Sequence, residues 1–381
     1  MPLQMNQCIW RLHLPPPDSI GDGKKILRKA AVYLGSNVYI RPKSVKELGI
    51  SGRIVAISND SSTTTLPKAT THLRVHKKRK TLVEDVRVSV QQHCPDMNSK
   101  CDPIKTGIRP SRLFPVYDII DSNDEQKRTH SLILLTPDTT NYRQLASSHV
   151  RAYDKVLEIG CSTGQCTALI LRRLILLHIN TSCKQDDKGV VKEGGKVVAF
   201  DTGSDMIEKA KHRVMSELNY LLPQGNSDND KMTAVGVTLN FHKVDAMTNP
   251  KNAITYATTG DDRCPDVILI DIGGNRELKA VVHMIHWVQT AFGTSPRLVI
   301  IKSRALVDEL ISTSSDHLDV GEGKCEWDEE AGKSENNQSI LGMNPKRPVV
   351  SENGVIQNAQ EWFTFSLLQS FSNKSTYVMT T

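Results

Sequence analysis

Short apolar runs alternate with longer amphipathic segments along the second half of the chain. Runs such as KVLEIG and DVILIDIGG are short and largely apolar, a pattern typical of strands buried on both faces. The segments between them repeat apolar residues at helical spacing. This alternation predicts βαβ units and a mainly parallel sheet that begins near residue 131. The predicted strands are 155–160, 196–201, 237–246, 266–274, 297–303 and 361–370, and the predicted helices are 165–177, 204–222, 278–292 and 305–313.

The first part of the chain has a different pattern. Runs rich in β-branched residues, separated by turn-rich stretches, predict a small domain that contains strands at 52–58, 83–90 and 113–120. Apolar spacing of about 3.6 residues predicts a helix at 24–34 before them. The domains that we expect are a basic N-terminal extension or small α+β domain over 1–128, an α/β domain over 131–313 plus 349–381, and a polar, disordered insertion over 314–348.

Composition excludes several classes of protein. No apolar run approaches the roughly 20 residues of a membrane-spanning helix, and the N-terminus lacks the apolar core of a signal peptide. The eight cysteines are scattered without a C-x-x-C pair, which disfavours a zinc knuckle and a disulfide scaffold. We therefore expect a soluble, intracellular protein with reduced thiols, no metal site and no membrane partner. The compartment and the oligomeric state are left open.

Charge is distributed unevenly. Residues 1–128 contain 22 Lys/Arg and 12 Asp/Glu, whereas the remaining 253 residues contain 26 and 30. The segment RVHKKRK (74–80) alone has five Lys/Arg in seven residues. A solvated loop, a contact with nucleic acid and a nuclear-import signal are all compatible with that segment. The overall asymmetry indicates a polyanionic partner for the N-terminal part, and RNA is the one we favour.

The stretch VLEIGCSTGQCT (156–167) contains a glycine loop with three interpretations. It satisfies G-x-S-x-G of serine hydrolases, and Ser162, Asp271 and His317 have the chain order of a triad. His317 lies in the polar insertion, however, and the loop does not follow several strands, so we disfavour a hydrolase. The loop lacks the third glycine of the dinucleotide fingerprint, which disfavours NAD and FAD. A loop that makes room for another nucleotide-like cofactor is the interpretation left.

Four successive predicted strands each deliver an acidic residue near their carboxyl ends. These residues are Glu158, Asp201, Asp245 and Asp271. In an open parallel sheet, ligands bind beyond the carboxyl ends of the strands. A single Asp after a strand is often only a turn former, but four in succession predict a ligand site at this edge.

These residues resemble a known family. VLEIGCSTG resembles motif I of class I S-adenosylmethionine (SAM)-dependent methyltransferases, and VVAFDTGSDMIEKAK, HKVDAM and DVILIDIGG resemble the next three motifs. The resemblance implies a Rossmann-like, doubly wound, mainly parallel seven-stranded sheet, with SAM as the cofactor. Asp201 would hold the ribose, and Asp245 with Ala246 the adenine edge. The cofactor-binding residues that it implies are Glu158, Gly160, Cys161, Ser162, Thr163, Gly164, Asp201, Asp245, Ala246 and Asp271.

The same motifs also indicate which kind of substrate group accepts the methyl group. The IDIGGN loop differs from the loops of amine and pyrimidine C5 methyltransferases. Asp271 and Lys302 end adjacent predicted strands and resemble the Asp and second Lys of the K-D-K-(E/H) set in RNA ribose 2′-O-methyltransferases, including fibrillarin-like ones. Glu361 would match the closing carboxylate, so the implied catalytic residues are Asp271, Lys302 and Glu361. The leading Lys has no clear match, and Arg143 is the nearest cation.

Several alternatives stay open at this point. Lys302 could simply form an ion pair with Asp271, without a catalytic role. The acceptor could be a small molecule or a protein side chain instead of RNA. A catalytically degenerate protein that binds SAM or nucleic acid is the non-enzymatic alternative.

Overall fold

The computed structural model describes residues 8–14, 37–44, 47, 49–59, 86–92, 104–108, 112–117, 130–182, 194–221, 236–259, 264–272, 278–315, 349–351 and 354–364. The chain divides into two compact units. The larger unit comprises residues 1–15 and 119–381, and the smaller unit comprises residues 16–118.

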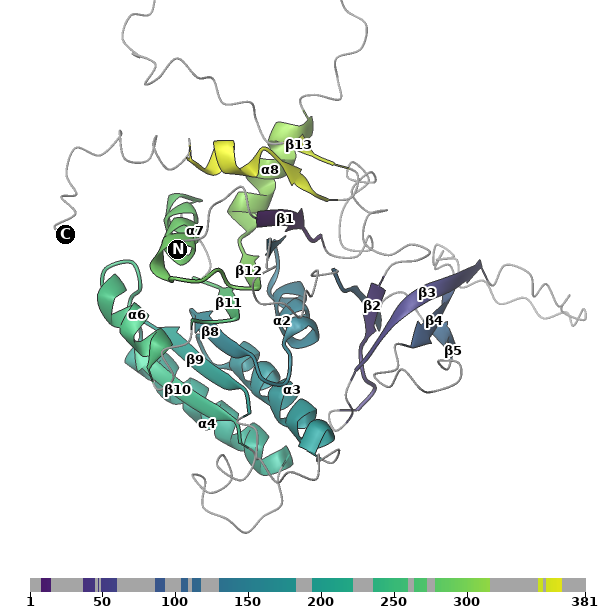
Figure 1. Ribbon diagram of the computed structural model, residues 1–381, viewed down its shortest axis with the longest axis horizontal. Helices are drawn as coiled ribbons and strands as arrows, with labels where there is room; N and C mark the ends of the chain where they lie inside the picture. Colours follow the sequence, from purple (N-terminus) through teal and green to yellow (C-terminus); the bar gives the residue numbers. More distant parts are fainter. Residues whose placement is uncertain are drawn as a thin grey trace, which may run out of the picture. The chain divides into compact units, whose positions relative to one another are not determined.

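A seven-stranded sheet, parallel throughout, forms the centre of the larger unit (Figure 1). Every position of β7, β8 and β11 is buried, so both faces of these strands are covered. Because all strands run in the same direction, their carboxyl ends meet at one edge. The sheet order is β1 (Cys8–Leu12), β7 (Ser131–Thr136), β12 (Leu298–Lys302), β11 (Val267–Ile270), β8 (Lys155–Ile159), β9 (Lys196–Asp201) and β10 (Thr238–Lys243).

Helices are interleaved with these strands, which is consistent with a Rossmann-like fold. The apolar residues of the helix after β9 recur at helical spacing and form its buried stripe, at Ile207, Ala210, Val214 and Leu218. None of the helices in the described part of the chain combines the length and hydrophobicity needed to cross a membrane. The helices are α2 (Thr139–His149), α3 (Gln165–Ser182), α4 (Ser204–Leu221), α6 (Pro250–Thr258), α7 (Leu278–Ala291) and α8 (Arg304–Ser315).

A C-terminal segment packs along the outer strand β1. It begins with a short hairpin of β13 (Val349–Val350) and β14 (Ile356–Gln357). Leu12 N donates to Gly354 O, and a Cβ at Gly354 would lie 2.8 Å from Leu12 O. Farther along the segment, Phe363 stacks on Trp10 with 4.4 Å between ring centroids. The segment therefore covers part of the sheet edge that β1 would otherwise expose.

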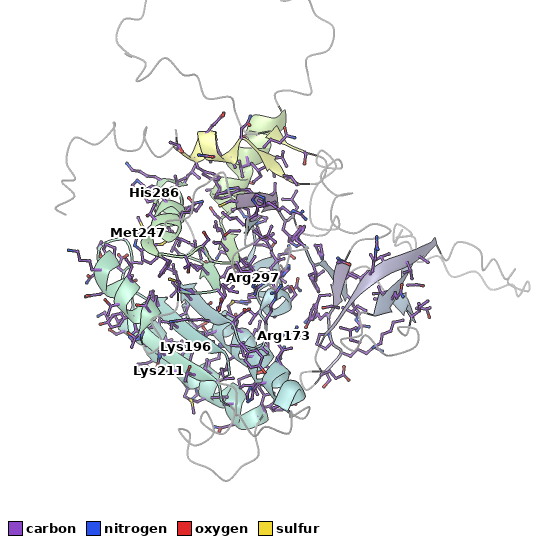
Figure 2. The ribbon with its side chains drawn as sticks, in the orientation of Figure 1. Arg173, Lys196, Lys211, Met247, His286 and Arg297 are labelled. Carbon is purple, nitrogen blue, oxygen red and sulfur yellow. The ribbon has the colours of Figure 1, made fainter. Side chains whose placement is uncertain are left out.

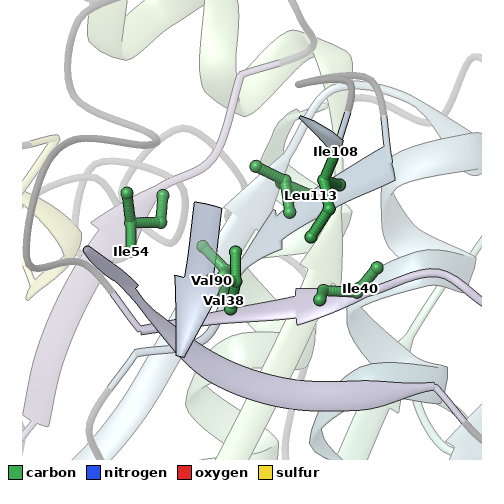
Figure 3. Packing of buried hydrophobic residues seen from close by; sticks show 6 residues of the cluster. All are labelled: Val38, Ile40, Ile54, Val90, Ile108 and Leu113. Carbon is green, nitrogen blue, oxygen red and sulfur yellow. The ribbon is translucent and has the colours of Figure 1, made fainter. Parts of the chain in front are cut away.

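The smaller unit is a five-stranded antiparallel sheet of order β5-β4-β3-β2-β6. Strand β6, the last of this unit in the chain, pairs with β2, the first. The core of the unit consists of aliphatic side chains from all five strands (Figure 3). Its described residues include six Lys/Arg but only one acidic residue, Glu47. The strands are β2 (Asn37–Ile40), β3 (Ile50–Asn59), β4 (Val86–Gln92), β5 (Ile104–Ile108) and β6 (Leu113–Pro115).

The prediction of a final strand over 361–370 is wrong for its described part. Residues 359–364 are helical, and the remainder lies outside the described residues. The neighbouring residues Trp362 and Phe363 are both buried. Successive side chains of a strand point to opposite faces, so a helical turn is the conformation that lets both pack inward at a covered edge.

Strands β1 and β7, which both precede β8 in the chain, complete the sheet instead. The assignment of residues 1–128 to one N-terminal part is therefore corrected, because β1 pairs with β7 in the larger unit. The predicted strand at 113–120 ends early, at Pro115, although Val116 N still donates to Asn37 O at 2.9 Å. The predicted helix at 24–34 lies outside the described residues, as does 316–348, nearly all of the predicted insertion.

Candidate functional site

A cavity of about 240 Å³ lies at the carboxyl-end edge of the larger sheet. Three carboxylates line it, those of Asp201, Asp245 and Asp271, and each comes from the end of a different strand. None of the described residues that line it is Lys or Arg. The edge predicted from the sequence is therefore hollowed and lined by acidic side chains.

The glycine loop connects β8 to α3 beside this cavity. Gly160 has φ +87°, and a Cβ there would lie 1.9 Å from Asp271 O. Gly164 has φ +74°, and its Cβ would lie 2.7 Å from Ala210 Cα on α4. These glycines thus make room for the chain leaving β11 and for the close approach of α4. Gly160 also lines the cavity.

The first N–H groups of the loop are used inside the protein. Gly160 N and Cys161 N both donate to Phe200 O at 2.9 Å. Ser162, which has φ +48°, donates its N–H to Asp201 Oδ2 at 2.8 Å. The second oxygen, Oδ1, accepts from Gly203 N at 2.9 Å. The Asp201 side chain therefore fastens the glycine loop to the end of β9.

The end of β10 contributes the next part of the site. Asp245 Oδ1 accepts from Met247 N at 2.9 Å, and its carbonyl accepts from Asn249 N at 2.8 Å. These bonds form the turn that places Asp245, Ala246 and Met247 on the cavity wall; Met247 is labelled in Figure 2. The predicted pair Asp245 and Ala246 therefore lies in the site.

Glu158 lies in β8, two residues before Gly160, and is not among the residues that line the cavity. It is 1% exposed, and Thr167 Oγ1 donates to its Oε2 at 2.5 Å. Burial raises the pKa of Glu158 to about 7, against hydrogen bonds from Thr167 and Cys166 that lower it. The positive charge of Arg143 on α2 also acts on this carboxyl group. Glu158 thus connects β8 to the first turn of α3.

Asp271 and Lys302 come together as predicted. Lys302 Nζ lies 2.6 Å from Asp271 Oδ1, and their side chains are 18% and 16% exposed. Although the charges are in contact, Oδ1 has no hydrogen bond of acceptable geometry. The two residues follow directly on paired positions of β11 and β12. The pair is a half-buried ion pair at the cavity, since Asp271 is one of its lining residues.

The structure does not bring Glu361 to this pair. Glu361 is exposed on the helical segment 359–364, which packs against β1. Two strands, β7 and β1, follow β12 toward that side of the sheet. The proposed match to a closing carboxylate depended on a strand over 361–370, and that strand is not formed by residues 361–364.

The remaining predicted residues of the loop do not all face the cavity. Ser162 lines it, whereas Cys161 is 3% exposed and packs in a cluster with Ala199, Ile207 and Ala210. Thr163 accepts a hydrogen bond from Arg213 Nε through its carbonyl at 3.0 Å. His317, the base of the disfavoured hydrolase triad, lies outside the described residues.

Several apolar lining residues escaped the sequence interpretation. Phe200, Met206, Val244 and Met284 line the cavity with the carboxylates. Met284 is only 1% exposed, and it nevertheless forms part of the cavity wall. Phe200 and Val244 directly precede Asp201 and Asp245, so for these two acids the preceding position was the usable signal.

No group of three or more His, Cys, Asp and Glu side chains is arranged to hold a metal ion within the described ranges. The site therefore consists of an acidic cavity, a glycine loop and one Lys–Asp pair. In the comparisons with known proteins, no family model and no curated protein sequence matches the chain.

Proposed function

We propose that the protein is a SAM-dependent methyltransferase that acts on RNA, with a ribose hydroxyl as the acceptor. One observation carries the cofactor assignment: Asp201, Asp245 and Asp271 line the cavity, and Lys302, at 2.6 Å from Asp271, offsets one of these three negative charges. SAM carries a sulfonium and an ammonium group against a single carboxylate. An acidic, partly desolvated cavity attracts such a net cation.

The glycine loop argues against a phosphate-bearing cofactor. Dinucleotide sites hold the pyrophosphate on free backbone N–H groups at a helix N-terminus. Here the N–H groups of Gly160, Cys161 and Ser162 already donate to Phe200 O and Asp201 Oδ2. A pyrophosphate in this position would lack those donors and would meet the Asp201 carboxylate.

The residues at the cavity fit the parts of SAM. Each oxygen of Asp201 accepts one backbone N–H and keeps a lone pair for a ribose hydroxyl. Ala246 and Met247 form an apolar wall beside Asp245, suited to an adenine ring. When bound, SAM would supply an activated methyl carbon for in-line displacement, so the protein's main task is to position the two reactants.

Lys302 and Asp271 are the groups that we assign to the acceptor. The ammonium and the carboxylate are held 2.6 Å apart on adjacent strands, and Asp271 lines the cavity. There Lys302 can donate to the acceptor oxygen and orient it toward the methyl group, and Asp271 can take up its proton. RNA is favoured as the substrate because the described residues of the smaller unit include six Lys/Arg and one acid.

Methyl transfer from labelled SAM to pools of RNA, protein and metabolites tests the proposal. We expect label in RNA, with loss of transfer but retention of SAM binding in Lys302→Ala. Lys209→Ala is the matched control, because Lys209 is exposed on α4 in an ion pair with Asp205. Equal transfer by Lys302→Ala and Lys209→Ala would overturn the role of Lys302. Label in protein or metabolites alone would overturn the RNA assignment.

A further inference from the structure

Two arginines of the smaller unit stand opposite each other on adjacent chain segments. Strands β2 and β6 pair antiparallel, with Ile40 opposite Leu113. One position farther along, Arg41 N donates to Arg112 O at 2.9 Å, so the pairing continues beyond the end of β2. Residues that lie opposite each other in an antiparallel pair point to the same side of the sheet. Arg41 and Arg112 are therefore cross-strand neighbours on one face.

This arrangement is unfavourable in the protein alone. Like charges directly opposite each other in a sheet repel. Arg112 Nη2 donates to Arg41 O at 2.7 Å, which holds the Arg112 side chain beside its neighbour. The described residues of strands β2 to β6 include no Asp or Glu. A bound anion that contacts both arginines would remove the repulsion.

The same face of the sheet carries a third arginine. Because side chains alternate along a strand, the residues of β2 point in turn to the core and to the opposite face. Ile40 belongs to the core shown in Figure 3, so Asn37 and Arg41 point to the opposite face. Arg53 of β3 lies opposite Asn37 in the register and is exposed. We call this surface, with Arg41, Arg53 and Arg112, the arginine face.

The arginine face offers positive charge but no exposed aromatic ring among its described residues. Tyr39 and Phe114 lie opposite each other on this face, yet each is only 6% exposed. Proteins that bind single-stranded nucleic acid stack its bases on aromatic side chains. Double-stranded RNA is held mostly through phosphate and ribose contacts that follow the shape of the helix. The composition of the arginine face therefore favours a duplex over a single strand.

We propose that the arginine face binds the phosphate backbone of a double-stranded segment of RNA. This inference deepens the proposed function, on which the choice of RNA as the polyanion rests. Guanidinium groups bind phosphate oxygens through pairs of N–H donors. Arg112 uses one donor on Arg41 O and keeps the others for phosphate. Contacts to phosphate carry no direct information on base sequence, so binding is independent of sequence.

Binding of the full chain to a short RNA duplex, measured by fluorescence anisotropy over a series of salt concentrations, tests the proposal. We expect Arg41→Gln to weaken binding about fivefold, equally for duplexes of different sequence. The slope of log K against log salt concentration should become shallower by about one unit, as one phosphate contact is lost. Arg41→Lys keeps the charge and should retain most of the affinity.

Lys105→Gln is the matched control within the same unit. Lys105 is exposed, but its partner in the register is the core residue Val90, so it lies on the opposite side of the sheet from Arg41. It removes the same charge and should change the affinity and the salt slope much less. Equal effects of Arg41→Gln and Lys105→Gln would overturn the assignment to the arginine face.

Thermal unfolding of the variants separates lost contacts from lost folding. Because Arg41→Gln removes a repulsion, its unfolding midpoint should be no lower than that of the wild type. A lower midpoint would contradict the unfavourable pairing of Arg41 with Arg112, and with it the proposal. One strand of the duplex alone should bind more weakly than the duplex, and tighter binding of the single strand would overturn the assignment to double-stranded RNA.

These measurements require no methyl transfer, so they separate this inference from the proposed function. If the wild-type protein does not bind the duplex, the inference is wrong, whatever the label from SAM shows. If the label reaches only protein or metabolites, the proposed function is wrong, and the binding data still decide whether the arginine face holds RNA.

Discussion

Asp201 accepts a hydrogen bond from the backbone N–H of Ser162 at 2.8 Å, so the carboxylate that ends β9 also holds the glycine loop that follows β8. The same side chain lines the cavity. Asp201 therefore both holds the glycine loop in its conformation and contributes a negative charge to the cavity. Substitutions that differ only in charge can separate these two roles.

Asp201→Asn and Asp201→Ala should behave differently. The amide keeps one acceptor oxygen for Ser162 N, removes the negative charge and turns its NH2 group toward Gly203 N, which loses its acceptor. We therefore expect a smaller loss of stability than in the alanine variant, together with weaker SAM binding. Alanine removes both acceptors and should cost about 1–3 kcal/mol of stability as well. Urea unfolding and calorimetry of each variant measure the two effects. Asp308→Ala, at an exposed position of α8, is the control. Equal stability of the Asn and Ala variants would show that the loop does not depend on Asp201.

Gly160→Ala should be strongly destabilising. The residue has φ +87°, and a Cβ would lie 1.9 Å from Asp271 O, so backbone must move to admit a methyl group. We expect a loss of more than about 2 kcal/mol in the free energy of unfolding. Gly293→Ala is the matched control, because a Cβ there would meet nothing within 4 Å. A loss no greater than that of Gly293→Ala would contradict the geometry of the loop.

A buried ion pair fixes the opposite edge of the sheet. Arg297 Nη2 lies 2.6 Å from Asp154 Oδ2, the side chains are 6% and 8% exposed, and Arg297 is labelled in Figure 2. Arg297→Met leaves Asp154 buried without its cation and should cost about 3–5 kcal/mol. Arg172→Met, which breaks a more exposed pair with Glu217, should cost about 1 kcal/mol or less. Thermal or urea unfolding measures the loss of stability in each variant. Similar losses in Arg297→Met and Arg172→Met would contradict the claim that the more deeply buried pair contributes more.

Stability should depend on the protonation of Glu158. Its pKa of about 7 in the folded protein lies above the usual 4.5, so the folded state binds more protons than the unfolded state between these values. The free energy of unfolding of the wild type, relative to Glu158→Gln, should therefore rise as pH falls from about 7 to about 5, by up to about 1.4 kcal/mol per unit. Because both proteins contain the same histidines, the contribution of the histidines to the pH dependence is absent from the difference in stability. A difference independent of pH would contradict the raised pKa.

The strands from β8 to β12 could be predicted because their signals are local. Each is a short apolar run, and Asp201, Asp245 and Asp271 stand at or just beyond the ends of their runs. Since parallel strands share a carboxyl-end edge, their convergence followed from the order of the elements. The Lys302–Asp271 contact was predictable for the same reason.

The features missed by the sequence interpretation depend on contacts between distant residues. β1 joins the sheet only by pairing with β7, whose Ser131 lies opposite Cys8. The helical turn at Glu361 depends on the stacking of Phe363 on Trp10. The use of the loop N–H groups by Phe200 and Asp201 is likewise a tertiary arrangement, which no spacing of glycines reveals.

Calorimetric titration of the purified protein with SAM, and separately with NAD, tests the central claim most directly. The acidic cavity and the occupied loop N–H groups predict that SAM binds and that NAD does not. Binding of SAM should weaken when Asp201 is replaced by Asn. Binding of NAD, or the absence of SAM binding, would contradict the assignment of this cavity to a cationic cofactor.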